Sequence, residues 1–232
     1  MTTIKEVQKA YDLLIRGIED KAREDEERAY GGIIRAGKGL LVESIGKNLI
    51  EIAWQELGGK ASRMNFFRET IKIPLKVDYL SRVRPKEVAD YIKANIDSYF
   101  YGLKTDIHVN IDGRFVLGVE CKAYTENAML KRILVDFTLL KHRFPDLKCS
   151  LLQLESQLTG DYSNPSKNVI YGSHSTHTLL SYFDVDLQII TLLEGERKVD
   201  EPIHQVEFFK DLTEQSLQRA VDQFKIILSE FR

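Results

Sequence analysis

The chain has 232 residues, of which 43% are hydrophobic and 29% charged, a composition typical of a folded globular protein rather than a disordered chain. Its two cysteines, Cys121 and Cys149, exclude a disulfide scaffold or a cysteine-rich zinc site and fit a reducing cytoplasm. The sequence has no apolar run of membrane-spanning length and no signal peptide, so we expect a soluble cytoplasmic protein with no membrane partner. The net charge of −2 gives no global indication of a nucleic-acid partner.

The N-terminal forty residues predict a helix followed by a bend. Apolar residues recur at helical spacing from Ile4 to Ile18, and an acid-rich stretch over residues 19–28 reads as a solvated helix face. Glycines at positions 31, 32, 37 and 39 then predict a bend before a second helix over about residues 40–57.

Residues 60–93 differ from the rest of the chain in charge. They hold nine basic and four acidic residues, an excess of five positive charges, interleaved with Phe66, Phe67 and Tyr79. Such a segment can follow a phosphate backbone, although a solvated surface is the simpler alternative. Pro85 predicts the first turn of a helix that runs to about Tyr101.

Two runs of alternating apolar and polar residues, Leu103–Ile111 and Arg114–Ala123, flank Asp112-Gly113 and predict a β-hairpin. A helix over about 125–142, a strand over 147–154, a short helix near 176–183 and a strand over 185–193 follow. Residues 159–178 read as a loop, and Asp211 with Glu214 predicts a capping box for the C-terminal helix.

Three charged residues of the hairpin are the predicted catalytic set. Alternation places Glu120 and Lys122 on one face of a strand whose other face is apolar. A three-residue loop from Ile111 to Gly113 would pair Asp106 with Gly118 and keep Asp106 on the face of Glu120. Two carboxylates on adjacent strands suit a hard cation such as Mg²⁺, and the lysine can orient a water or stabilise charge on a phosphate.

The pattern of Asp106, thirteen intervening residues and Glu120-Cys121-Lys122 resembles the signature of the PD-(D/E)xK nuclease superfamily. Acid-x-lysine triplets also occur at 19–21, 146–148 and 196–198, but only the one at 120–122 closes a hairpin whose partner strand supplies a second acid. Thr105 stands where the signature has proline. Some members also place an acid of the first core helix near the metal, which makes Glu43 a candidate and Glu51 the second choice; pairing with Lys47 is the plain alternative for either.

This resemblance implies a restriction-endonuclease-like α/β core, with a central mixed β-sheet carrying the catalytic hairpin between flanking helices. We expect one nuclease domain over residues 1–232, with a core at about 40–195, an N-terminal helical elaboration over 1–39 and a C-terminal helix over about 211–232.

The function implied is that of a Mg²⁺-dependent, sequence-specific endonuclease of double-stranded DNA acting as a homodimer, similar to type II restriction enzymes. A structure-selective repair or recombination nuclease, and a non-catalytic DNA-binding protein that keeps the fold, are the alternatives. The candidate DNA contacts come from the basic segment, from the polar end of the strand near residue 154 and from the following loop. They are Arg63, Arg68, Lys72, Lys76, Gln153, Glu155, Gln157, Lys167 and Asn168.

Overall fold

The computed structural model describes residues 3–24, 30–163 and 173–232. The helices are α1 (Ile4–Glu24), α2 (Tyr30–Glu56), α3 (Lys86–Ala94), α4 (Asn127–Arg143), α6 (His174–Leu180) and α7 (Glu214–Leu228). The strands are β1 (Met64–Phe67), β2 (Ile71–Pro74), β3 (Phe100–Leu103), β4 (Ile107–Ile111), β5 (Arg114–Glu126), β6 (Lys148–Gln157) and β7 (Leu187–Thr191). No helix in these ranges is both long and apolar enough to cross a bilayer.

Five strands form a mixed sheet in the order β1-β4-β5-β6-β7. β1, β4 and β5 pair antiparallel, whereas β5, β6 and β7 pair parallel. β6 is buried from Cys149 to Ser156, as a parallel strand covered on both faces requires. The predicted mixed α/β architecture with flanking helices is confirmed.

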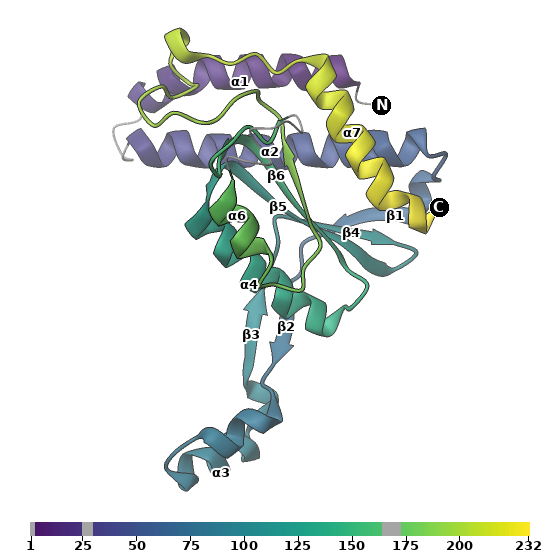
Figure 1. The fold of residues 1–232 in the computed structure, drawn as a ribbon. Helices are drawn as coiled ribbons and strands as arrows, with labels where there is room; N and C mark the ends of the chain where they lie inside the picture. Colours follow the sequence, from purple (N-terminus) through teal and green to yellow (C-terminus); the bar gives the residue numbers. More distant parts are fainter. Residues whose placement is uncertain (1–2, 25–29, 164–172) are drawn as a thin grey trace.

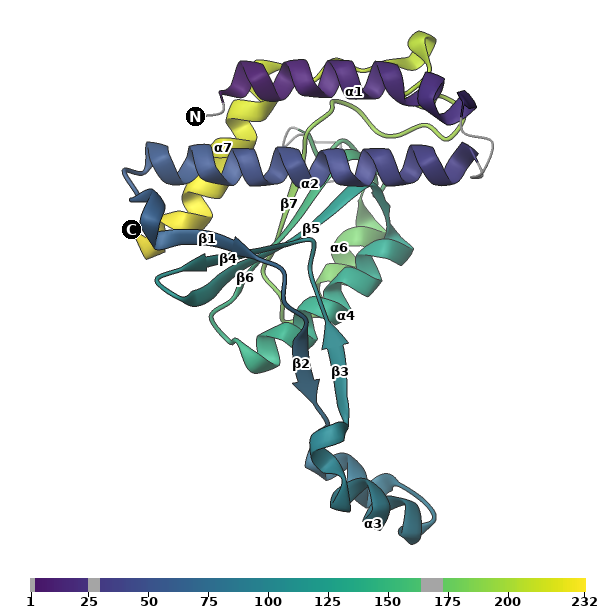
Figure 2. The same ribbon diagram turned by 180° about the vertical axis from the view of Figure 1, so that it is seen from behind.

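Helices cover both faces of the sheet (Figures 1 and 2). On one face, α1, α2 and α7 enclose a core that includes Tyr11, Trp54 and Phe224. On the other face, α4 packs through Leu130, Phe137 and neighbouring apolar residues, with α6 beside it. The amphipathic pattern of α7 explains its place, because its buried residues recur three and four positions apart.

α2 lies directly on the strands of the hairpin and on β6. A Cβ atom at Gly46 would stand 2.8 Å from Ile107 Cδ1 and 2.8 Å from Leu152 Cδ2, so a larger residue would force these buried side chains to shift. The helix begins at Tyr30, and the predicted bend at glycines 31–39 is therefore wrong. Helix-interior glycines cost about 1 kcal/mol each, an amount that the packing of α2 against the sheet and α7 offsets.

The β4–β5 hairpin closes with a two-residue turn, so the predicted three-residue loop is wrong. Ile111 pairs with Arg114, and Asp112 and Gly113 have φ values of 52° and 76°, as a type I′ turn requires. Asn110 pairs with Phe115 and Val109 with Leu117, so Val116 is the extra residue of a β-bulge. The bulge shifts the register by one residue, which returns the polar side chains of both strands to the same face of the sheet. The register ends at the Ile107–Val119 pair, and Asp106 and Glu120 are the next residues beyond it on the two chain segments.

Residues 71–103 form an arm that projects from the body of the molecule (Figures 1 and 2). β2 and β3 pair as a two-stranded ribbon, and its far end carries α3 and short 3₁₀ turns. The predicted helix from Pro85 to Tyr101 is thus wrong beyond Ala94, and the predicted strand Leu103–Ile111 is two strands separated by Lys104, Thr105 and Asp106. Asp106 therefore belongs neither to the ribbon nor to the five-stranded sheet.

Boundaries differ elsewhere too. β5 runs to Glu126, two residues into the predicted helix, and β6 extends to Gln157, beyond the predicted end at 154. The N-cap of α7 is Thr213, whose side chain accepts a hydrogen bond from the N–H of Ser216 at 3.1 Å. The capping box predicted at Asp211 is therefore wrong, since the threonine sits one residue before the helix and satisfies its free N–H.

Gly46→Ala is expected to lower the free energy of unfolding by about 1–3 kcal/mol, because the added methyl group overpacks the contact between α2 and the sheet. The matched control is Gly39→Ala in the same helix, where an added Cβ meets nothing within 4 Å. That change should stabilise by up to about 1 kcal/mol. Urea denaturation of the two variants checks both signs; equal effects would contradict the close approach at Gly46.

Candidate active site

Asp106, Glu120 and Lys122 meet around a single ammonium group. Lys122 Nζ donates to Glu120 Oε2 at 2.6 Å, to Asp106 Oδ2 at 2.9 Å and to the carbonyl oxygen of Cys121 at 3.2 Å. The structure thus brings together the three residues predicted from the hairpin pattern. They lie where β4 begins and β5 continues beyond it, at the base of the arm.

The backbone of β5 fixes the Asp106 carboxylate. The N–H of Cys121 donates to Asp106 Oδ2 at 2.7 Å, so this oxygen accepts from both the ammonium and a peptide group. Asp106 and Glu120 follow the last residue pair of the hairpin, and both carboxylates accept from Lys122 Nζ, so they face one cation position. Three oxygen atoms of the chain therefore surround that position.

Burial is uneven across the site. The Glu120 side chain is 11% exposed, whereas those of Lys122 and Asp106 are 30% and 37% exposed, so the site opens to solvent on the Asp106 side. Burial raises the pKa of Glu120 to about 7, and the charges of Asp106 and Asp136 add to the rise against the opposing effect of Lys122. Burial lowers the pKa of Lys122, but the two carboxylates outweigh it and hold that pKa above its ordinary value.

His108 holds the backbone just before Asp106. Its Nε2 accepts a hydrogen bond from the N–H of Thr105 at 3.0 Å, which requires a neutral ring protonated on Nδ1. Burial lowers the pKa of His108 to about 4, with the charge of Lys104 adding to the effect. The ring packs against Phe67 and Phe115, with centroids 4.6 and 4.8 Å away. A cluster of buried and half-buried rings thus supports the segment that carries Asp106.

Comparison with known proteins identifies the family. The chain is 52% identical over 212 residues, which are 90% of this chain and 88% of the relative, to the type II restriction enzyme DdeI of Desulfomicrobium norvegicum (strain DSM 1741 / NCIMB 8310). The chain belongs to the type II restriction enzyme family. Its function as a site-specific endodeoxyribonuclease, expected from the hairpin pattern, is thereby confirmed.

The other comparisons add little to this assignment. No protein-family model matches the chain. A chain of the native BbvCI A2B2 tetramer, solved at low resolution, aligns with 98% of this chain and 87% of its own length. The identity of 12% and TM-score of 0.38 are too low for this likeness to bear on fold or mechanism.

Glu43 of this restriction enzyme does not join the three-oxygen cluster. Its carboxylate pairs with Lys47 at 2.7 Å and also with Arg68. An ion pair with Lys47 was the alternative to a metal role for this residue. Burial raises the pKa of Glu43, but the hydrogen bonds from Lys47 and Arg68 outweigh it and leave the pKa lowered. Glu51, the second choice, is exposed on α2. A role for Glu43 beside a metal stays a prediction.

The basic residues predicted to contact DNA lie in different parts of the structure. Arg63 binds Asp112 at 2.7 Å and the carbonyl of Phe231 at 3.1 Å, at the turn end of the hairpin and away from Asp106. Its guanidinium is thus held by contacts within the fold. Lys72 and Lys76, by contrast, are exposed on the arm.

The polar end of β6 does not form an open reading surface. Gln153 is fully buried and donates to Thr191 Oγ1 at 2.9 Å, while Glu155 is 3% exposed and pairs with Lys210 at 3.0 Å. Their predicted role in base contacts is inconsistent with this burial, because β6 continues through them as a covered central strand. Gln157 is half-buried and accepts from Arg197 at 2.5 Å. Lys167 and Asn168 lie outside the described residues.

The structure adds groups that the sequence reading missed. Asp136 of α4 acts electrostatically on both Glu120 and Lys122. A helical projection signals it, because it is an acid between Ile133 and Phe137 on the buried side of α4. The peptide group of Cys121 contributes both a donor and an acceptor to the site, which no side-chain pattern reveals.

The raised pKa of Glu120 predicts a pH dependence of stability in metal-free protein. Between about pH 4.5 and 7 the folded state keeps a proton that the unfolded state releases, so this stabilisation is present at low pH and lost as the pH rises through 7. The isosteric Glu120→Gln variant should lack this loss, which is on the order of 3 kcal/mol. Urea unfolding of both proteins from pH 4.5 to 8 measures it; a difference between them that stays constant with pH contradicts the assignment.

Proposed function

We propose that this chain cuts double-stranded DNA at a specific sequence with Mg²⁺ held by Asp106, Glu120 and the carbonyl of Cys121, and with Lys122 beside the reacting phosphate. The observation that carries the proposal is the cage of three oxygens around Lys122 Nζ. An ammonium ion in such a cage stands where a metal cation would bind.

The donor set fits Mg²⁺. Two carboxylates and a peptide carbonyl are hard oxygen ligands, and Mg²⁺ typically takes one or two carboxylates and completes its shell with waters and substrate phosphate. In the described segments no cluster of three or more His, Cys, Asp and Glu side chains is placed to hold an ion. The remaining ligands of a metal would therefore be the Cys121 carbonyl and waters or phosphate oxygens from the solvent-open side. Bound there, Mg²⁺ would polarise the phosphate and lower the pKa of a water.

Each residue of the chain has a distinct task in this proposal. The N–H of Cys121 keeps the Asp106 carboxylate aimed at the cation position. Glu120, with a pKa near 7, is poised to ionise when a cation replaces the ammonium. Lys122 keeps its proton because its pKa is raised, so it acts as a hydrogen-bond donor that stabilises negative charge on the phosphate.

Two such centres would let the enzyme cut both strands in one binding event. Each chain carries one predicted set, and the strands of a duplex are related by a two-fold axis, so a homodimer supplies one centre to each strand. We propose this homodimer, cytoplasmic and acting on duplex DNA. Arg68, Lys72, Lys76 and Gln157 remain candidate DNA contacts. The intact set of Asp106, Glu120 and Lys122 argues against a non-catalytic role.

Asp106→Ala should lower the cleavage rate at least about a hundredfold, because it removes one carboxylate of the cation position and an acceptor of Lys122. Digestion of a mapped plasmid with Mg²⁺ tests this, with Asp200→Ala, an exposed acid away from the hairpin, as the matched control. Discrete fragments from wild type, lost in Asp106→Ala and with EDTA, are expected.

Two results would contradict the proposal. Equal cleavage by wild type and Asp106→Ala would remove Asp106 from the site. Cleavage confined to mismatched or branched DNA would favour the structure-selective alternative over sequence recognition.

A further inference from the structure

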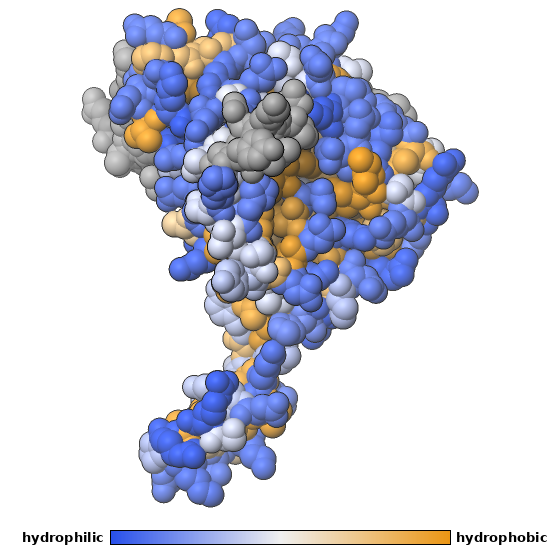
Figure 3. Space-filling view, viewed as in Figure 1, coloured by the Kyte–Doolittle hydropathy of each residue, from blue (hydrophilic) through white to orange (hydrophobic). Residues whose placement is uncertain are grey.

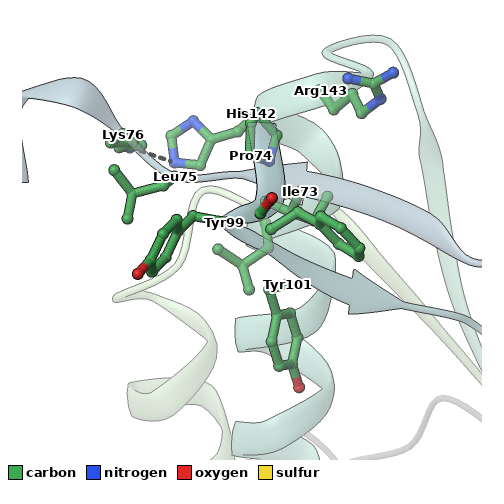
Figure 4. A pocket seen from close by; sticks show the side chains of 11 residues that line it. Ile73, Pro74, Leu75, Lys76, Tyr99, Tyr101, His142 and Arg143 are labelled. Atoms are coloured by element: carbon green, nitrogen blue, oxygen red, sulfur yellow. Dashed lines mark hydrogen bonds between the residues drawn. The ribbon is translucent and has the colours of Figure 1, made fainter. Parts of the chain in front are cut away.

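A pocket of about 880 Å³ lies where the arm joins the body, between the β2–β3 ribbon and the end of α4 (Figure 4). Ile73, Leu75 and Leu139 contribute apolar side chains, and Tyr99, Phe100 and Tyr101 contribute aromatic rings. Figure 3 shows apolar surface along this neck of the arm. The volume exceeds that of a phosphate group and suits a longer sugar–phosphate segment.

The charged side chains that line the pocket, Lys76 and Arg143, are both positive. Its lining includes Lys76, His142 and Arg143 and no acidic residue. Lys76 Nζ lies 3.3 Å from His142 Nε2, the contact drawn as a dashed line in Figure 4. Within the described segments, neither Lys76 nor Arg143 forms an ion pair with a carboxylate. Asp97 lines an adjoining pocket of about 370 Å³, which shares Arg143 and Tyr99 with this one.

The dipole of α4 does not account for this cluster. Cations in the last turn of a helix often bind its free carbonyls. Lys141 instead donates to the carbonyl oxygens of Pro145 and Leu147, just beyond the helix, at 3.0 and 3.4 Å. His142 and Arg143 are exposed, and neither makes a hydrogen bond to a carbonyl in the described residues. The positive charge of Arg143 therefore faces solvent in the same pocket as Lys76.

The pocket is joined to the active site by a short piece of chain. Tyr101 in its wall precedes Asp106 by five residues, which span at most about 18 Å when extended. Phosphates of one DNA strand follow each other every ~3.4 Å along the axis, so this reach covers about five base pairs. Duplex DNA with its reacting phosphate at Asp106 would have flanking phosphates at the neck of the arm.

We propose that this neck pocket binds the DNA backbone a few base pairs from the cleaved bond, with Lys76 and Arg143 as its phosphate contacts. The inference rests on the proposed DNA-cleaving function. A flanking phosphate would supply the negative charge that Lys76 and Arg143 lack, and the aromatic wall would pack against the sugars. Such contacts position the duplex without reading its sequence.

The test measures binding without cleavage. A fluorescent duplex that lacks a recognition site is titrated in EDTA over a series of salt concentrations, with wild type and the Lys76→Ala/Arg143→Ala double variant. The slope of log K against log salt should be shallower by about 1.8 in the double variant, since each phosphate contact contributes ~0.9. Lys9→Ala, an exposed lysine on α1 and hence on the other face of the sheet, should leave the slope unchanged.

Further measurements keep the outcomes separate. The Lys76→Arg/Arg143→Lys variant should retain the slope, and urea unfolding should show all variants folded. An unchanged slope in the alanine double variant overturns the proposal. So does an unchanged slope with lost self-association in sedimentation, which would assign the pocket to a second copy of the chain. Because binding is read in EDTA, failure of wild type to cut plasmid DNA tests the proposed function separately.

Discussion

The ammonium group of Lys122 occupies the centre of the site, where two carboxylates and one carbonyl converge. Two carboxylates this close repel each other unless a cation lies between them, and burial of Glu120 sharpens the requirement. The fold therefore has to place Asp106, Glu120 and a cation within hydrogen-bonding distance of one another. The ammonium group of Lys122 supplies that cation.

Several features of the fold serve this convergence. The bulge at Val116 turns Asp106 to the same face as Glu120 despite the two-residue turn. His108 and its aromatic neighbours hold the segment that breaks the strand at Asp106. Gly46 lets α2 pack closely against Ile107 of β4 and Leu152 of β6, which helps to fix β4 against the neighbouring helix. The arm begins at the same break, so DNA bound at the active site would meet the arm directly.

The hairpin and the three charged residues of the site were predictable from the local sequence pattern. Alternation around Asp112-Gly113 gave the hairpin and its three charged residues, because side-chain facing follows directly from strand geometry. The loop length was wrong because a bulge has no signature in the alternation of Arg114–Ala123. The arm was missed because its short strands carry too few alternating residues. The burial of Gln153 and Glu155 depends on strands and loops far away in sequence, which local polarity does not report.

If a metal binds at these three oxygens, it has to compete with the ammonium group of Lys122 for them. Calorimetric titration of Mg²⁺ into wild type and Lys122→Met at pH 8, without DNA, tests this competition most directly. If the ammonium and the metal share one position, Lys122→Met binds Mg²⁺ more tightly than wild type, and Asp106→Asn abolishes the binding. Weaker or equal binding by Lys122→Met would show that the metal position lies elsewhere.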